Sequence, residues 1–110
     1  MTKIETILDK NDIIKSCRVK GHAGAGKTGT DIVCAAVSVL VRTAVSVLSN
    51  REGISIRYEV PEPGFFFFEA DYTVEGKEFL FAVGEFLING LRSVADEFPK
   101  YCKFIQTRRI

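Results

Sequence analysis

Hydrophobic and polar residues follow seven successive patterns along the chain, and each pattern predicts one element of secondary structure. Runs in which apolar and polar residues alternate predict strands, whereas apolar residues at spacings of three and four predict helices. The five predicted strands cover residues 2–8, 13–20, 54–60, 64–74 and the segment CKFIQTRRI after Pro99. The two predicted helices start after Asp31 and at Glu75, and they end near Asn50 and Phe98. The second helix carries an apolar stripe at helical spacing: Phe79, Val83, Phe86, Leu87, Leu91, Val94 and Phe98.

The element order is therefore ββαββαβ, and the turns indicate how the chain folds back. The polar turn at Asp9–Asn11 makes the first two strands a hairpin, and PEPG at residues 61–64 is a turn between the third and fourth strands. Hairpins beside long helices are typical of α+β proteins. We therefore predict a two-layer α+β sandwich, in which a mostly antiparallel sheet packs against two long helices and residues 1–110 form a single domain.

The first predicted helix is almost free of charge. Residues 32–48 contain one charged side chain, Arg42. This stretch is short for spanning a bilayer, and an Arg in its middle costs about 2.5 kcal/mol or more there, so we expect a buried helix and no membrane contact. The helix nevertheless has little polar face, and the run Phe65–Phe68 places aromatic rings on both faces of its strand. A central position in the core explains both features, and so does a homodimer that covers the surplus apolar surface.

The composition is that of an ordinary soluble globule. The 110 residues are 46% hydrophobic and 26% charged, which argues against a disordered chain. Fifteen Lys and Arg against 14 Asp and Glu give a net charge of +1, without the basic excess of a module that binds nucleic acid directly. No basic start followed by an apolar run opens the sequence, so we expect no signal peptide and a cytoplasmic location. Three cysteines without a C-x-x-C pair favour free thiols, and we expect no metal and no cofactor.

Residues 21–38, GHAGAGKTGTDIVCAAVS, carry the candidate chemistry, and two interpretations compete for them. The first is a phosphate-binding loop of the pattern G-x-x-x-x-G-K-[ST], between a strand and a helix. The pattern is matched at Gly21, Gly26, Lys27 and Thr28. In such loops the Lys and the hydroxyl residue begin the helix, whereas here Gly29 and an N-cap at Asp31 delay the expected helix start by about one turn. The hairpins also differ from the parallel sheet that carries these loops. Nucleotide binding stays an alternative function.

The second interpretation is a thiol nucleophile with a histidine base. With Asp31 as N-cap, Cys34 occupies the third helical position, where unpaired amides and the positive end of the helix dipole stabilise a thiolate. The amides of this first turn are also candidates for an oxyanion hole. His22 is the single histidine of the chain, and the glycine-rich loop after it can bring its imidazole to the sulfur. Ser38 lies one turn further along the same helix face. The alternative is that Cys34 is only a small core residue.

The same block resembles the ribosomal-processing cysteine protease family (Prp) of bacteria. The resemblance rests on GHA at residues 21–23, on Gly29 and on DIVCAAVS at residues 31–38, and it extends over the whole chain in length and element order. It implies a catalytic dyad of His22 and Cys34 in a homodimeric α+β fold. It also implies removal of a short N-terminal extension from a large-subunit ribosomal protein, with cleavage after a pair of phenylalanines. Supporting positions of the family block match at Gly21, Gly29, Asp31 and Ser38.

Three further expectations concern the rest of the chain. Cys17 and Cys102 have no helix N-terminus or histidine near them in the sequence, so we expect structural thiols. Recognition of phenylalanine requires an apolar pocket, which the strand with Phe65–Phe68 is a candidate to line. A third class of function also stays open, a ribosome-assembly factor in which the block is structural and Cys34 has no catalytic role.

Overall fold

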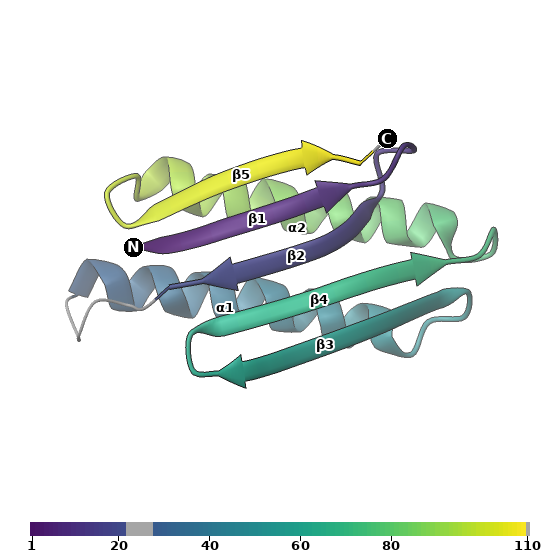
Figure 1. Ribbon diagram of the computed structural model, residues 1–110, viewed down its shortest axis with the longest axis horizontal. Coiled ribbons are helices and arrows are strands. Elements are labelled where there is room, and N and C mark those ends of the chain that lie inside the picture. Colours follow the sequence, from purple (N-terminus) through teal and green to yellow (C-terminus); the bar gives the residue numbers. More distant parts are fainter. Residues whose placement is uncertain (22–27, 110) are drawn as a thin grey trace.

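Five strands and two helices follow the predicted order (Figure 1). The computed structural model describes the backbone of residues 1–21 and 28–109, and the side chains of residues 1–21 and 32–109. The elements are β1 (Thr2–Leu8), β2 (Ile14–Lys20), α1 (Thr28–Ser49), β3 (Ile54–Glu62), β4 (Phe65–Tyr72), α2 (Lys77–Glu97) and β5 (Cys102–Arg108). The predicted strands and the second helix agree with these bounds to within a few residues, whereas α1 begins earlier than expected.

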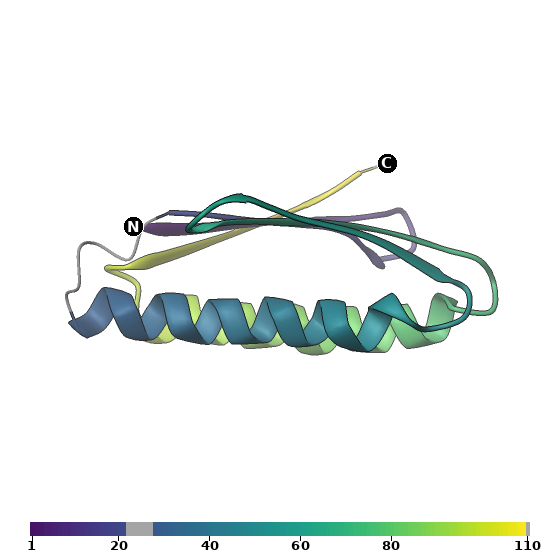
Figure 2. The same ribbon diagram turned by 90° about the horizontal axis from the view of Figure 1, so that it is seen from below.

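The strands form one sheet in the order β3-β4-β2-β1-β5. The pairs β1–β2, β2–β4 and β3–β4 are antiparallel, and β1 pairs with β5 in parallel. A parallel pair needs a long crossover, which α2 provides before β5. Both helices lie side by side on one face of the sheet, and its other face is free of them (Figure 2). The prediction of a two-layer α+β sandwich with a mostly antiparallel sheet is confirmed.

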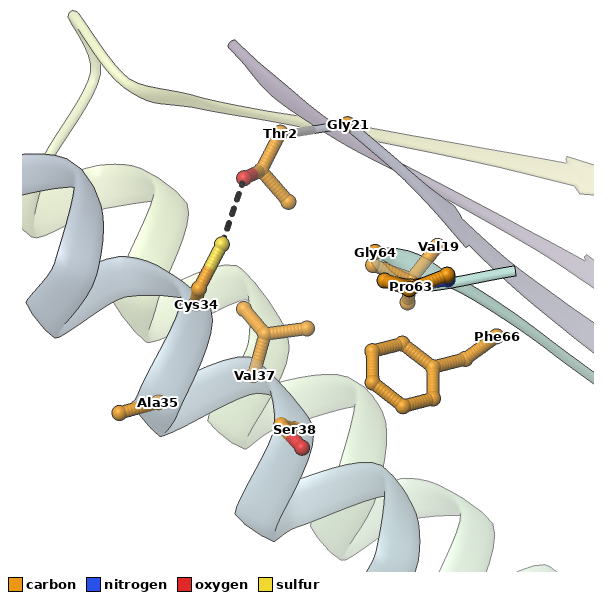
Figure 3. A pocket seen from close by; sticks show the side chains of 10 residues that line it. All are labelled: Thr2, Val19, Gly21, Cys34, Ala35, Val37, Ser38, Pro63, Gly64 and Phe66. Carbon is orange, nitrogen blue, oxygen red and sulfur yellow. Dashed lines mark hydrogen bonds between the residues drawn. The ribbon is translucent and has the colours of Figure 1, made fainter. Parts of the chain in front are cut away.

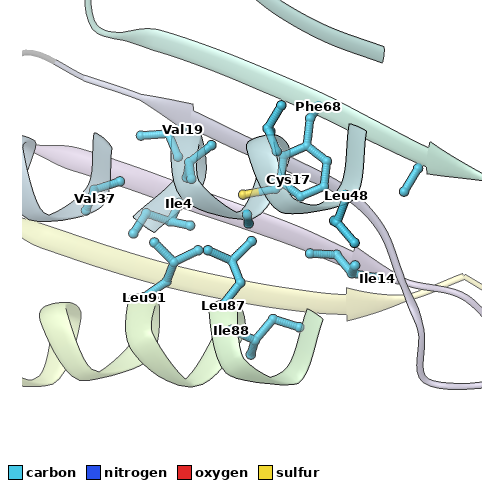
Figure 4. Close-up of a cluster of buried hydrophobic side chains, with 14 of the residues drawn as sticks. Ile4, Ile14, Cys17, Val19, Val37, Leu48, Phe68, Leu87, Ile88 and Leu91 are labelled. Carbon is cyan, nitrogen blue, oxygen red and sulfur yellow. The ribbon is translucent and has the colours of Figure 1, made fainter. Parts of the chain in front are cut away.

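Helix α1 covers the sheet with one apolar face. Its buried residues recur at spacings of three and four: Val33, Val37, Val41, Ala44, Val45 and Leu48. They belong to the same buried cluster as Ile4 and Val19 of the sheet (Figure 4). Residues Ile32–Ser49 are long and apolar enough to cross a membrane by length and composition. Here the apolar face packs on the sheet, and the opposite side of the helix leaves Val39 and Val47 exposed.

Helix α2 turns most of its predicted apolar stripe to the core, since Leu87 and Leu91 are buried and Phe79, Val83, Val94 and Phe98 pack against the core cluster. Its buried residues are Leu80, Gly84, Leu87, Ile88, Leu91 and Ala95. The predicted stripe contains two of these leucines, but Phe86 is 76% exposed. The helix approaches the sheet closely at Gly84, where an added Cβ would lie only 2.9 Å from Ile14 Cγ2. Gly84 thus allows α2 to pack against the beginning of β2, while Phe86 lies on the exposed side of the helix.

The four phenylalanines of β4 divide between the two faces of the sheet. Phe66 and Phe68 belong to the core on the helix side, and Phe68 is completely buried. On the other face, the guanidinium groups of Arg18 and Arg57 lie 5.8 and 5.3 Å from the centre of the Phe67 ring. These are cation–π distances, so the ring is covered by charged side chains that stay in contact with water. A central strand between β2 and β3 thus accommodates aromatic rings on both faces.

Candidate active site

A pocket of about 410 Å3 lies where the first part of α1 faces one end of the sheet (Figure 3). The beginning of β1, the end of β2 and the turn between β3 and β4 form its other walls. The lining residues are Thr2, Val19, Gly21, Cys34, Ala35, Val37, Ser38, Pro63, Gly64 and Phe66. Most of them are apolar or glycine, and the volume falls within the usual range of ligand pockets, about 300–1,000 Å3. Phe66 supplies an aromatic wall, as the sequence suggested for this strand.

Cys34 and Ser38 lie one helical turn apart on α1, and both line this pocket. Cys34 is half-buried, so its sulfur is accessible from the pocket. Val37 is completely buried next to them and fixes the rotation of this part of the helix against the sheet. A substrate can reach a thiol of this kind, unlike a thiol enclosed in the core.

Thr2 is a polar neighbour of the thiol that the sequence analysis did not single out. Its Oγ1 lies 3.7 Å from Cys34 Sγ, within hydrogen-bonding distance for sulfur, and Thr2 is only 2% exposed (Figure 3). The alternation along β1 places Thr2 on the inward face with Ile4 and Thr6. A buried hydroxyl at the end of a strand was the available signal, but no local pattern pairs it with a helix residue 32 positions away.

Gly21 also lines the pocket, at a position where the backbone accepts only glycine. Its φ of +143° is a conformation that L side chains rarely adopt, and an added Cβ would lie 2.3 Å from the Met1 carbonyl oxygen. Its amide donates a hydrogen bond of 3.2 Å to the carbonyl of Gly64 in the β3–β4 turn. The end of β2 is thereby attached both to the beginning of β1 and to the turn that closes the pocket.

The early start of α1 changes the surroundings of Cys34. The helix begins at Thr28, so Asp31 is an internal helix residue and the prediction that it is the N-cap is wrong; Gly29 lies in the first turn. Cys34 is the seventh helical residue instead of the third, and at 1.5 Å per residue it lies about 9 Å along the axis from Thr28. The unpaired amides belong to the first turn, and the dipole effect fades within it. Cys34 therefore receives less help from the helix N-terminus than the sequence predicted, and the expected oxyanion amides lie a turn before it.

The error has a physical reason. The preference of Asp for an N-cap and the low helix propensity of Gly are each worth only about 1 kcal/mol. Once the packed part of a helix exists, each residue added to its end gains a backbone hydrogen bond. The hydrogen bonds gained by extending α1 back to Thr28 offset the low helix propensity of Gly29 in its first turn.

His22 and Lys27 lie outside the described residues, so the dyad stays a prediction and so does the role of the loop. Because Thr28 begins α1, one of the two arguments against a phosphate-binding loop no longer holds. The other stands, since β2, the strand before the loop, is antiparallel to both β1 and β4. Phosphate-binding loops follow a strand of a parallel sheet.

The other two cysteines are buried and free, as expected of structural thiols. Burial raises the pKa of the Cys17 thiol to about 12. Burial also raises the pKa of Cys102, and the charge on Cys34 adds to this effect. Protonated thiols are poor nucleophiles, so neither residue competes with Cys34 for a reactive role.

An accessible thiol at an apolar pocket, on a helix that packs against a mixed sheet, indicates a small α+β enzyme of the thiol-dependent class. A family comparison gives this class its name. The model of the family "Cysteine protease Prp" matches residues 1–103, and the chain belongs to this family.

Solved structures share the whole fold. A crystal structure of a Streptococcus mutans protein is 26% identical, with a TM-score of 0.84 over 99% of this chain and 96% of that one. The essential ribosomal processing protease Prp from S. aureus, in complex with a substrate peptide, is 15% identical, with a TM-score of 0.81 over 96% of this chain and 99% of that one. The same protease with a covalently linked product peptide is 18% identical, with a TM-score of 0.76 over the same shares of the two chains. A search of curated proteins gives no match.

Proposed function

We propose that this chain is a cysteine endopeptidase that removes a short N-terminal extension from a large-subunit ribosomal protein, cleaving after a Phe-Phe pair through a dyad of Cys34 and His22. Membership of the cysteine protease family supports the reaction class. The similar S. aureus protein is described as a ribosomal processing protease and holds a substrate peptide, which supports the substrate class. Processing of a bacterial ribosomal protein requires a cytoplasmic location.

The observation that supports the dyad is that Cys34 and Gly21, the described residue just before His22, line one pocket. Cys34 lines this pocket from α1, and Gly21, the residue bonded to His22, lines it from the end of β2. The strand that precedes the histidine, β2, thus ends beside the thiol. A thiol and an imidazole at one pocket are the two groups that cleavage of a peptide bond by covalent catalysis requires.

The walls of the pocket support an aromatic substrate side chain. Val19, Val37 and Phe66 form an apolar surface beside Cys34, with Pro63 across the opening. Burial of an aromatic ring against such a surface is favourable, and ring–ring contact with Phe66 adds specificity. Ser38 lines the same pocket one turn beyond the thiol and is the residue that we propose to contact the substrate backbone.

In the proposed reaction, the Cys34 thiolate attacks the carbonyl carbon of the second phenylalanine and forms a tetrahedral adduct. The C–N bond then breaks as the His22 imidazolium protonates the leaving amine, which leaves a thioester. The neutral imidazole takes a proton from water as the water oxygen attacks the thioester. This step releases the carboxylic acid and restores the thiolate and the imidazolium.

A peptide assay tests the proposal. A peptide that contains a Phe-Phe pair is incubated with the protein and its products are identified by mass spectrometry, with an Ala-Ala version of the peptide as substrate control. We expect cleavage after the pair in the wild type, and loss of cleavage in Cys34→Ala and in His22→Ala with unchanged circular dichroism. Cys17→Ala, which removes a buried thiol elsewhere, serves as the matched control and retains cleavage. Cleavage by Cys34→Ala would refute the mechanism.

The two alternative functions predict other results. A nucleotide-binding protein would lose its function in Lys27→Ala and would gain thermal stability from Mg-ATP. A protease tolerates Lys27→Ala. A non-catalytic assembly factor would keep its function in Cys34→Ala.

We further propose that the protein acts as a homodimer that buries the outer face of the helix layer. Val39 and Val47 of α1 and Phe86 of α2 are exposed on the side of the helices away from the sheet. A depression of about 380 Å3 between the two helices is lined by Val39, Val47 and Phe86, together with Thr43 and Val83. Exposed apolar patches of this kind are typical of protein interfaces, and a second copy brings a self-complementary patch.

Light scattering after size-exclusion chromatography tests the dimer. We expect a dimer in the wild type and a monomer in Phe86→Glu. Val74, which is 86% exposed in the loop before α2, provides the control, since Val74→Glu introduces the same charge away from the helix face and leaves the dimer intact. A wild-type monomer at micromolar concentration would refute this assembly.

A further inference from the structure

We propose that Thr2 is a positioning residue for the nucleophile: its hydroxyl donates a hydrogen bond to the Cys34 sulfur and holds the thiolate at the pocket. The inference rests on the proposed function of Cys34 and adds a residue outside the His22–Cys34 block. It starts from a single contact, the 3.7 Å between Thr2 Oγ1 and Cys34 Sγ.

The direction of this hydrogen bond follows from the protonation state of the sulfur. In the thiol form either atom can be the donor. A thiolate carries no proton, so in the reactive form the hydroxyl must donate. A hydrogen bond to the charged form favours that form, and it does so more strongly in a buried site than in water.

Thr2 can do this because its backbone is held on both sides. Its amide donates a hydrogen bond of 2.8 Å to the carbonyl of Tyr101, and its Cα is paired with that of Cys102 in β5. On the β2 side, an added Cβ at Gly21 would lie 2.8 Å from the Thr2 Cα, so the two strands are in close contact there. The β-branched side chain has few rotamers, and at 2% exposure it has little room to leave its position.

The surroundings leave this hydroxyl as the main polar partner of the sulfur among the described residues. The pocket residues that the structure describes are uncharged. On β5, the thiol of Cys102 is protonated at neutral pH because burial and the charge on Cys34 raise its pKa. The early start of α1 also places Cys34 beyond the first turn, where the helix dipole contributes most. The sequence predicted that the helix N-terminus stabilises the Cys34 thiolate, and part of that stabilisation thus comes instead from the Thr2 hydroxyl on β1.

The test measures the rate of Cys34 alkylation by iodoacetamide against pH, resolved by mass spectrometry, in three variants. Thr2→Val keeps the shape of the side chain and removes the hydroxyl, and Thr2→Ser restores the hydroxyl. Thr6→Val is the matched control, since Thr6 is an equally buried threonine on the same face of β1 whose hydroxyl bonds Gln106 instead. Circular dichroism confirms that each variant is folded under the conditions of the assay.

We expect Thr2→Val to raise the midpoint of alkylation by about 0.5–1 pH unit, which is roughly a three- to tenfold slower reaction at a pH well below the midpoint. Thr2→Ser and Thr6→Val keep the wild-type midpoint. Peptide cleavage by Thr2→Val falls in kcat by a similar factor with KM unchanged. An unchanged midpoint in Thr2→Val, or an equal shift in Thr6→Val, would overturn the inference.

Failure of this inference is distinguishable from failure of the proposed function. Alkylation needs no substrate, so it reports the Thr2 contact even if the peptide is not the substrate. If Cys34→Ala cleaves the peptide, the proposed mechanism fails. If Cys34→Ala is inactive and Thr2→Val behaves as the wild type, only the role of Thr2 fails.

Discussion

Replacement of Gly21 by alanine is the perturbation whose effect follows most directly from the structure. Gly21 has a φ of +143°, and an alanine Cβ there would lie 2.3 Å from the Met1 carbonyl oxygen and 2.8 Å from the Thr2 Cα. Both are backbone atoms of β1, so no side chain can move aside to relieve the contact. The strand itself must shift, or the backbone of residue 21 must change its conformation.

The expected cost has two parts. A non-glycine residue at such a φ costs about 1–2 kcal/mol, by analogy with the left-handed region. Forcing an extra carbon into a packed site costs about 1–3 kcal/mol more. The free energy of unfolding should therefore fall by about 2–5 kcal/mol, a large fraction of the 5–15 kcal/mol that is usual for a domain.

Urea denaturation followed by circular dichroism measures this loss, with Gly64→Ala as the control. Gly64 also has a positive φ, 84°, so its replacement shares the conformational penalty of about 1–2 kcal/mol. We expect Gly21→Ala to be the less stable variant of the two, and to alkylate Cys34 more slowly because β1 carries Thr2 away from the sulfur. A Gly21→Ala protein within about 0.5 kcal/mol of the wild type would refute the reasoning, because neither the φ nor the contact would then matter.

Three further changes test other parts of the fold. Gly84→Ala gains about 1 kcal/mol of helix propensity but forces a Cβ to 2.9 Å from the buried Ile14 side chain. Thermal denaturation should therefore show a net loss of stability of about 1 kcal/mol, and a gain in stability would mean that α2 can move away from Ile14. Lys3 is paired in register with a lysine on each neighbouring strand, so Lys3→Glu should raise the free energy of unfolding by about 0.5–1 kcal/mol in low salt. If the gain is electrostatic, 1 M NaCl reduces it; a gain that 1 M NaCl leaves unchanged would contradict this explanation. Burial raises the pKa of the Asp9 carboxyl, but hydrogen bonds from Tyr72 and from backbone amides outweigh it, so the pKa lies below its usual range. Asp9 thus stabilises the fold above about pH 4, and this contribution is lost as the pH falls through the lowered pKa; Tyr72→Phe should weaken the pH dependence of urea denaturation in this acid range, and an unchanged dependence would contradict it.

The sequence was informative wherever one element alone determines the pattern. Alternation along β1 reports which of its side chains face the core, and its bounds were predicted to the residue. The spacing of Cys34 and Ser38 likewise placed both on one helix face, where they line the pocket together. The apolar stripe of α2 was informative except at Phe86, which is 76% exposed although it lies at helical spacing with core residues.

Relations between distant elements could not be predicted in the same way. The pairing of β1 with β5 depends on the path of the whole chain, and with it the position of Thr2 opposite Cys34. The start of α1 depends on a balance of small terms, of which the capping preference of Asp31 was only one. The sequence thus singled out a cysteine that lines the pocket but misjudged where its helix begins.

The central position of β1 has a consequence for how the protein is made. Its first neighbour, β2, follows it directly, whereas β5 is the last element, and the Thr6–Gln106 hydrogen bond joins residues 100 positions apart. Contacts at such separation form late, because the long intervening chain must be ordered first. During synthesis, one edge of β1 therefore stays unpaired until β5 has been translated, after all the residues that line the pocket. Thr2, whose amide bonds the Tyr101 carbonyl just before β5, is therefore among the last residues of the sheet to be held in place.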